Sequence, residues 1–300
     1  MPGIFCEALN RRKFLGHSAK ALTAVAFASP ARLFAGADKP EELRVALLSD
    51  THIPADFKAG EHRKFLPWSN LRTVAPQVIQ ARPKAVIING DAARLTGQLE
   101  DYVELKKLLA PVAAEAPVYI GLGNHDDREN FFKVFPQPPR ESQSVKEKHL
   151  LVIEWPGIRF VVLDSLMYVN RVAGLLGKAQ RDWLAQYLER SDGRPTVLFV
   201  HHTLDDGDGS LMDAERLFEL TRPHKKVKAI FYGHSHKYAF SEQQGVHLVN
   251  LPAVGYNFAD SEPVGWVDAR FTSEGAALTL KAFAGNREGD GKTTSITWKM

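Results

Sequence analysis

Five short clusters of polar residues in this 300-residue chain combine histidine, aspartate and asparagine in patterns that could bind metal ions. The clusters are Asp50-Thr51-His52, Gly90-Asp91, Gly123-Asn124-His125-Asp126, His201-His202 and Gly233-His234-Ser235-His236. Any one of these clusters is a weak indication of a metal site, whereas five in this order are a strong indication. Imidazole, carboxylate and amide oxygen ligands without sulfur suit divalent or trivalent ions of Mn, Fe, Zn or Co. Two such ions about 3.5–4 Å apart can stabilise a phosphoryl group and provide hydroxide near neutral pH, so the clusters are compatible with metal-dependent phosphoryl chemistry.

Each cluster directly follows a short apolar run, and we expect these runs to be buried β-strands. The expected strands are residues 43–49, 84–89, 117–120, 195–200 and 227–232. Segments with helical spacing lie among them, at residues 66–81, 98–114, 178–189 and 213–220. This alternation predicts βαβ units and a largely parallel sheet. Ligands of such sheets bind beyond the carboxyl ends of the strands, so the five clusters should meet there.

Two other segments are predicted to form antiparallel strands. Pro156-Gly157 separates apolar runs at residues 149–155 and 158–164, which predicts a hairpin. Residues 238–300 have the pattern of several short antiparallel strands joined by turns.

The order and spacing of the five clusters resemble those of the calcineurin-like metallophosphoesterase superfamily over about residues 43–237. The resemblance implies an α/β fold, a four-layer αββα sandwich with two central mixed β-sheets. It also implies how seven ligands divide between two metal ions. The first ion would take Asp50, His52 and His236, the second would take Asn124, His201 and His234, and Asp91 would bridge both.

The same resemblance implies hydrolysis of a small phosphodiester, or alternatively a phosphomonoester, by attack of a metal-bound hydroxide. His125 would contact the substrate phosphate and protonate the leaving alkoxide, and Asp126 would orient His125. Arg94 either binds a substrate phosphate or pairs with a carboxylate, and His202 either contacts substrate or supports the loop. The competing hypothesis is a non-catalytic phosphate-ligand or metal-binding envelope protein with the same fold. Such proteins usually lose metal ligands, whereas this chain retains all seven.

The first 37 residues resemble a twin-arginine (Tat) export signal. Arg11-Arg12 precedes a moderately apolar stretch at residues 19–28, and Ala35-Gly36-Ala37 predicts cleavage after Ala37. The alternative is a basic amphipathic helix on the domain surface. The signal predicts two parts, residues 1–37 and a metallophosphoesterase domain at 38–300. It also predicts the Tat export machinery as a partner and a periplasmic or extracellular location.

Composition excludes several classes of function for residues 38–300. The only cysteine, Cys6, lies in the expected signal, which excludes disulfides, thiolate ligands and cysteine nucleophiles from the mature part. The formal net charge of +3 falls to −1 there, because five of the 38 basic but only one of the 35 acidic residues precede residue 38. Without clustered positive charge we expect no general nucleic-acid binding. No apolar run reaches the roughly 18 residues of a spanning helix, so we expect no stable membrane insertion.

Overall fold

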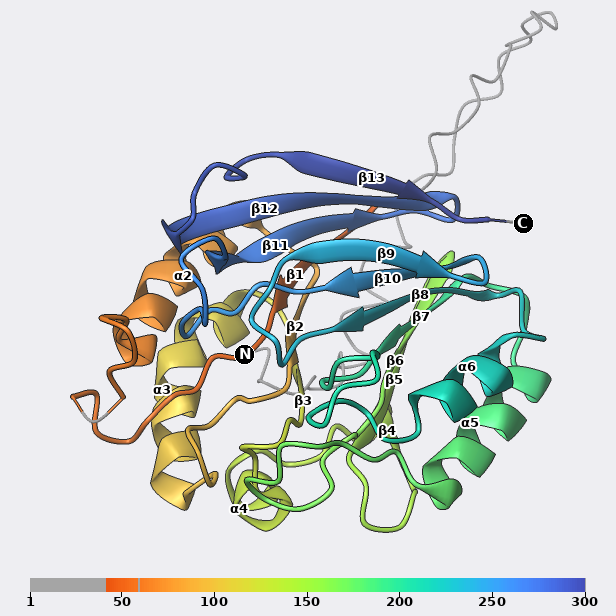
Figure 1. The fold of residues 1–300 in the computed structure, drawn as a ribbon, viewed down its shortest axis with the longest axis horizontal. Helices are drawn as coiled ribbons and strands as arrows, with labels where there is room; N and C mark the ends of the chain where they lie inside the picture. Colours follow the sequence, from red (N-terminus) through yellow and green to blue (C-terminus); the bar gives the residue numbers. More distant parts are fainter. Residues whose placement is uncertain (1–41, 59, 300) are drawn as a thin grey trace, which may run out of the picture.

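Two β-sheets pack face to face and a pair of helices covers the outer face of each (Figure 1). The computed structural model describes residues 42–58 and 60–299. Helices α2 (Pro67–Ala81) and α3 (Leu99–Glu115) cover the first sheet, and α5 (Lys178–Arg190) and α6 (Ala214–Thr221) cover the second. The predicted four-layer αββα sandwich is therefore confirmed. The predicted export signal lies outside the described residues.

The first sheet has six strands in the order β13-β12-β11-β1-β2-β3. Its strands are β1 (Leu43–Leu48), β2 (Ala85–Asn89), β3 (Val118–Gly121), β11 (Pro263–Phe271), β12 (Gly275–Gly285) and β13 (Thr293–Thr297). Strands β1, β2 and β3 are parallel, as the strand–helix alternation predicted, and β11 pairs antiparallel with β1. The sheet is mixed for this reason.

The second sheet has seven strands in the order β4-β5-β6-β7-β8-β10-β9. Its strands are β4 (Ser142–Gln143), β5 (Leu150–Trp155), β6 (Ile158–Val162), β7 (Thr196–Phe199), β8 (Val227–Tyr232), β9 (Ala239–Gln243) and β10 (Val246–Asn250). Strands β5 and β6 form the predicted hairpin, and β6, β7, β8 and β10 run parallel.

The prediction for the C-terminal segment was wrong in two respects. Strand β10 pairs parallel with β8, and β11 and β12 are long strands of nine and eleven residues. The segment also divides between the sheets, since β9 and β10 extend the second sheet whereas β11 to β13 extend the first. Local alternation of apolar residues identifies strands but does not say which sheet edge they join.

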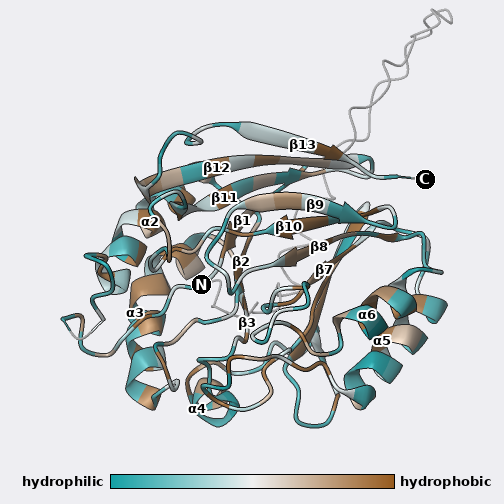
Figure 2. Ribbon diagram, in the orientation of Figure 1, coloured by the Kyte–Doolittle hydropathy of each residue, from teal (hydrophilic) through white to brown (hydrophobic). Residues whose placement is uncertain are grey.

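The strands that carry the polar clusters are buried on both faces. In β1, Val45 and Leu47 point between the two sheets, whereas Ala46 and Leu48 point toward α2 and α3. Figure 2 shows these central strands largely in brown and the outer faces of the helices largely in teal. Burial of both faces explains why the sequence shows continuous apolar runs before each cluster.

Helix α4 (Arg128–Val134) was not predicted from the sequence. Seven residues are too few to show a helical period, but Asp127 supplies a start signal, because its side chain accepts a hydrogen bond from the backbone N–H of Asn130 at 2.9 Å. This helix follows the third polar cluster almost directly. Among residues 42–58 and 60–299, no helix combines the length and apolar composition needed to cross a membrane.

Candidate metal centre

The five polar clusters meet at the carboxyl ends of β1, β2, β3, β7 and β8. Backbone hydrogen bonds hold neighbouring clusters together, since Asp50 N–H donates to Gly90 O at 3.1 Å and His52 N–H donates to Asp91 O at 2.9 Å. In the second sheet, Gly233 N–H donates to His201 O at 2.9 Å. The loops after the strands therefore continue side by side and bring the clusters into one site.

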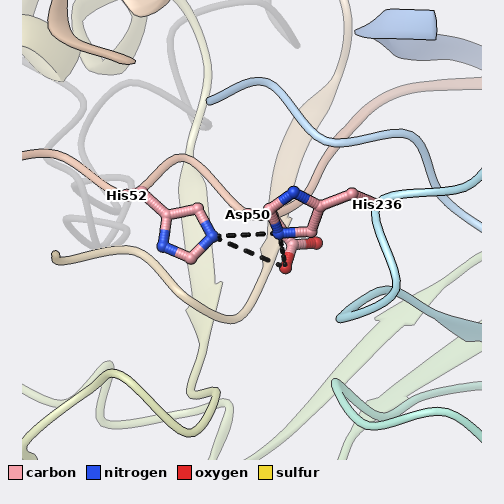
Figure 3. A group of neighbouring side chains, drawn as sticks. All are labelled: Asp50, His52 and His236. Carbon is pink, nitrogen blue, oxygen red and sulfur yellow. Dashed lines mark hydrogen bonds and ion pairs between the residues drawn. The ribbon is translucent and has the colours of Figure 1, made fainter. Parts of the chain in front are cut away.

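Three groups of side chains in this site have donor atoms within 4.8 Å of one another. The groups are Asp50, His52 and His236 (Figure 3); His52, Asp91 and His125; and Asp91, His201 and His234. The first and third groups contain six of the seven predicted ligands, all but Asn124. Asp91 belongs to the second and third groups and so lies between the two sides of the site.

Hydrogen bonds hold one oxygen of the Asp50 carboxylate and one of the Asp91 carboxylate. The other oxygen of each faces the histidines. In Asp50, Oδ2 accepts from Ser49 Oγ at 2.5 Å and from His234 N–H at 3.2 Å, while Oδ1 lies 3.3 Å from His236 Nε2. In Asp91, Oδ1 accepts from His125 N–H at 2.9 Å, while Oδ2 lies 3.3 Å from His201 Nε2 and 3.9 Å from His52 Nε2. In this arrangement one oxygen of each carboxylate faces the histidines of the site.

Backbone carbonyls orient two of the histidine rings so that Nε2 faces the centre. His201 Nδ1 lies 2.9 Å from Asn89 O, and His236 Nδ1 lies 2.6 Å from Tyr256 O. A carbonyl can only accept, so in both rings Nδ1 carries a proton, and in the neutral ring the lone pair is on Nε2. This is the tautomer that binds a metal through Nε2.

Several buried atoms of the site have no hydrogen-bond partner in the described part of the chain. They include Asp50 Oδ1, Asn124 Oδ1 and His201 Nε2, which are atoms of predicted ligands. A buried polar atom without a partner costs about 1–3 kcal/mol, so several of them in one site indicate a bound group. The residues therefore suit a site for two metal ions.

Burial and the charges of neighbouring side chains give the histidines of the site different pKa values. Burial lowers the pKa of His52 to about 3 and, with the charge on His201, lowers that of His234 to about 4. Burial also acts to lower the pKa of His201, but the charges of Asp91 and Asp50 outweigh it and raise the value to about 10. His201 therefore holds the positive charge that balances the carboxylates, which a metal ion would replace.

The backbone is strained where the ligands sit. Asp50, His52, Asp91, His234 and His236 all have positive φ, between 47° and 68°. Residues with a Cβ seldom adopt this left-handed conformation, and each costs on the order of 1–3 kcal/mol. Five such residues in one site are typical of a functional centre that the rest of the fold holds in place.

Asp126 does not orient His125, contrary to the prediction. Its carboxylate accepts hydrogen bonds from the backbone N–H groups of Gly123, Ala92 and Ala93 at 2.8–3.2 Å and from Tyr102 Oη at 3.0 Å. Burial and the charge of Asp91 raise the pKa of Asp126 to about 6 despite these donors. The carboxylate thus ties the loop after β2 to the loop after β3 through those backbone amides.

Leu95 supplies the contact that orients His125. The Leu95 carbonyl oxygen lies 2.7 Å from His125 Nδ1, and the opposite nitrogen, Nε2, lies 4.0 Å from Asp91 Oδ2. The His125 side chain is 19% exposed, whereas those of Asp91 and His52 beside it are buried. His125 can therefore reach both the centre and a molecule in the solvent.

The two predicted substrate residues have different environments. His202 is fully buried, its Nδ1 lies 2.7 Å from Ser165 Oγ, and its ring packs against those of His201 and His234. This supports the alternative in which His202 supports the loop. Arg94 is partly exposed, and its positive charge acts to lower the pKa of both Asp101 and Tyr256.

Sequence reasoning missed several residues that shape the site. Asn89 donates from its side chain to Val200 O at 3.0 Å and so links the two sheets beneath the centre. Asn170 N–H donates to Asn124 O at 2.6 Å and fixes the loop of a predicted ligand. Tyr256 stacks on the His52 ring, with centroids 4.8 Å apart. Only Asn89 carried a signal, as a polar residue ending an apolar strand.

A family model described as calcineurin-like phosphoesterase matches residues 43–238, which include every predicted ligand. The chain belongs to the calcineurin-like phosphoesterase family. The family and its hydrolytic class, predicted from the sequence, are confirmed. This family assignment agrees with the geometry of the Asp/His groups at the strand ends.

Named relatives and a solved structure agree with the family. The chain is 28% identical over 260 residues to the 3′,5′-cyclic adenosine monophosphate phosphodiesterase CpdA of Haemophilus influenzae, covering 81% of this chain and 90% of that one. It is 26% identical over 238 residues to the glycerophosphodiester phosphodiesterase GpdQ of Enterobacter lignolyticus, covering 73% and 81%. A dimetal phosphatase from Danio rerio has the same fold, with a TM-score of 0.64, 16% identity and coverage of 87% and 100%.

Proposed function

We propose that the protein is a binuclear metal-dependent phosphodiesterase. The assigned ligands are Asp50, His52 and His236 for one ion, Asn124, His201 and His234 for the other, and Asp91 as the bridge. The observation that carries this assignment is the set of buried ligand atoms without partners, which includes Asp50 Oδ1, Asn124 Oδ1 and His201 Nε2. Two bound ions supply positive charge that stabilises the phosphate oxygens and activates water near neutral pH.

His125 acts in this proposal as the proton donor to the leaving group. With Nδ1 held by the Leu95 carbonyl, Nε2 is the nitrogen that faces the centre and the substrate. A positioned imidazole of this kind contributes about 10²–10⁴ to the rate. Arg94, which is partly exposed, would bind a substrate oxygen with its guanidinium.

The proposed substrate class is a small phosphodiester. This is supported by the named activities of the relatives, one a phosphodiesterase of cyclic adenosine monophosphate and the other of glycerophosphodiesters. A diester presents one negative charge and two ester groups, so its second ester group must be accommodated by residues beside the metal ions.

The purified protein loaded with manganese should hydrolyse bis(p-nitrophenyl) phosphate faster than p-nitrophenyl phosphate. A chelator should abolish both reactions. The reason is that the two metal ions supply the positive charge that stabilises the phosphate and activates water. Release of p-nitrophenolate and metal content measured on the same samples check this. Turnover that persists after complete removal of metal would contradict the proposal, and a faster monoester reaction would reassign the substrate class.

We also propose that the Tat machinery exports the protein and that a peptidase removes residues 1–37. Twin arginines, an apolar stretch and a small-residue cleavage site in the correct order support this proposal. N-terminal sequencing of the exported protein should begin at Asp38. An exported chain that begins at Met1 would contradict it.

A further inference from the structure

An aromatic surface lies beside the Asp50–His52–His236 group. The loop after β10 contributes Tyr256 and Phe258, and both rings pack on His236, with centroids 4.6 Å and 4.2 Å from it. Phe258 lies nearly parallel to the imidazole, at an interplanar angle of 21°. The ring of Phe258 therefore covers one face of a predicted metal ligand.

One part of the Phe258 ring is covered and the rest is open to solvent. One face of the ring stacks on His236. The His62 ring meets the Phe258 ring edge-on, with centroids 6.2 Å apart and an interplanar angle of 88°. The residue nevertheless remains 52% exposed. An aromatic ring with one face fixed and another in water can accept a second planar group by stacking.

The position of this ring is fixed by polar contacts of its own backbone. Arg63 Nη1 donates to Phe258 O at 2.7 Å, and Arg63 also pairs with Asp260 in the same loop. Two residues earlier, Tyr256 O accepts from His236 Nδ1 at 2.6 Å. The loop is thus bound both to the metal centre and to the segment after β1, so that stacking on Phe258 needs little ordering of the loop.

We propose that Phe258 is a specificity-determining residue on which a planar aromatic group of the substrate, a nucleobase or another aryl ring, stacks. This inference rests on the proposed phosphodiesterase function, with the substrate phosphate at the Asp/His groups. The aromatic group is the second ester substituent, the part that does not leave. Stacking of a base on an aromatic side chain is worth about five- to a hundredfold in affinity.

The test uses two diesters that share p-nitrophenolate as the leaving group. Thymidine 5′-(p-nitrophenyl phosphate) carries a base, and methyl p-nitrophenyl phosphate carries none. Phe258→Leu, which retains apolar area but removes the aromatic face, should raise KM for the nucleoside diester about tenfold or more. It should change KM for the methyl diester less than about twofold, and Phe258→Tyr should behave as the native protein.

Phe240→Leu is the matched control, because Phe240 is a second exposed phenylalanine whose ring packs against Tyr238. It should leave KM for both diesters unchanged. Equal increases in KM for the two diesters in Phe258→Leu, or no increase for either, would overturn the proposal.

Equilibrium binding separates this inference from the proposed function. Adenosine 5′-monophosphate and ribose 5-phosphate carry the same phosphate and differ by the base. Calorimetry should show that the native protein binds the nucleotide about tenfold more tightly and that Phe258→Leu removes this difference. Equal affinities in the native protein would overturn stacking on Phe258. Absence of diester turnover with the expected binding difference would contradict only the phosphodiesterase function.

Discussion

Asp91→Asn should lower turnover of bis(p-nitrophenyl) phosphate by several orders of magnitude and reduce the metal content of the protein. Asp91 Oδ1 accepts from the His125 backbone N–H, and Oδ2 faces His201 and His52 at 3.3 Å and 3.9 Å. The amide oxygen of asparagine would keep the first contact, since an N–H needs an acceptor. Its NH₂ group would then occupy the place of Oδ2, where it cannot bind a metal ion.

Metal content by elemental analysis and turnover on the same preparation check this expectation, with circular dichroism as the test of folding. Asp182→Asn is the matched control, because it makes the same substitution on an exposed turn of α5 and pairs with Lys178 there. It should retain both metals and full activity. An Asp91→Asn protein with two bound ions and native turnover would exclude Asp91 as the bridging ligand.

His125→Ala should lower kcat by about 10²–10⁴ while metal content stays at the native level. His125 offers Nε2 to the centre but makes its fixed contact through Leu95 O, outside the ligand groups of the proposed ions. As a proton donor, it matters most when the leaving group is a strong base. The loss should therefore be large for a diester with an alkoxide leaving group and much smaller for one that releases p-nitrophenolate.

Comparison of the two leaving groups in native and variant protein gives the decisive measurement. His224→Ala removes a histidine outside the polar clusters, and neither reaction should change in that control. Equal losses for both leaving groups would assign His125 to phosphate binding, and loss of metal would assign it to the ligand set.

Much of the site could be predicted because its residues follow strands that are buried on both faces. Such strands appear as uninterrupted apolar runs, and the polar residues that directly follow each run must lie at the sheet edge. Asp50, Asp91 and His201 were located in this way. Their chemistry also follows from residue type, since imidazole and carboxylate without sulfur favour a particular set of metals.

The partners of individual side chains could not be predicted in the same way. Asp126 is adjacent in sequence to His125, but its carboxylate turns to the backbone of the loop after β2. Burial supplies the reason, since a buried carboxylate is most stable where several N–H groups converge on it. Sequence adjacency carries no information about where those N–H groups are.

In the sequence by itself, the order and spacing of the five polar clusters indicated the family, and local apolar patterns located the strands that carry these clusters. The tertiary structure decided which sheet the C-terminal strands join, that His202 is buried against Ser165, and that Phe258 stacks on His236. Each of these features joins segments that are not adjacent in the chain. Such contacts depend on how two sheets and their loops pack together, and packing is set by the whole fold at once.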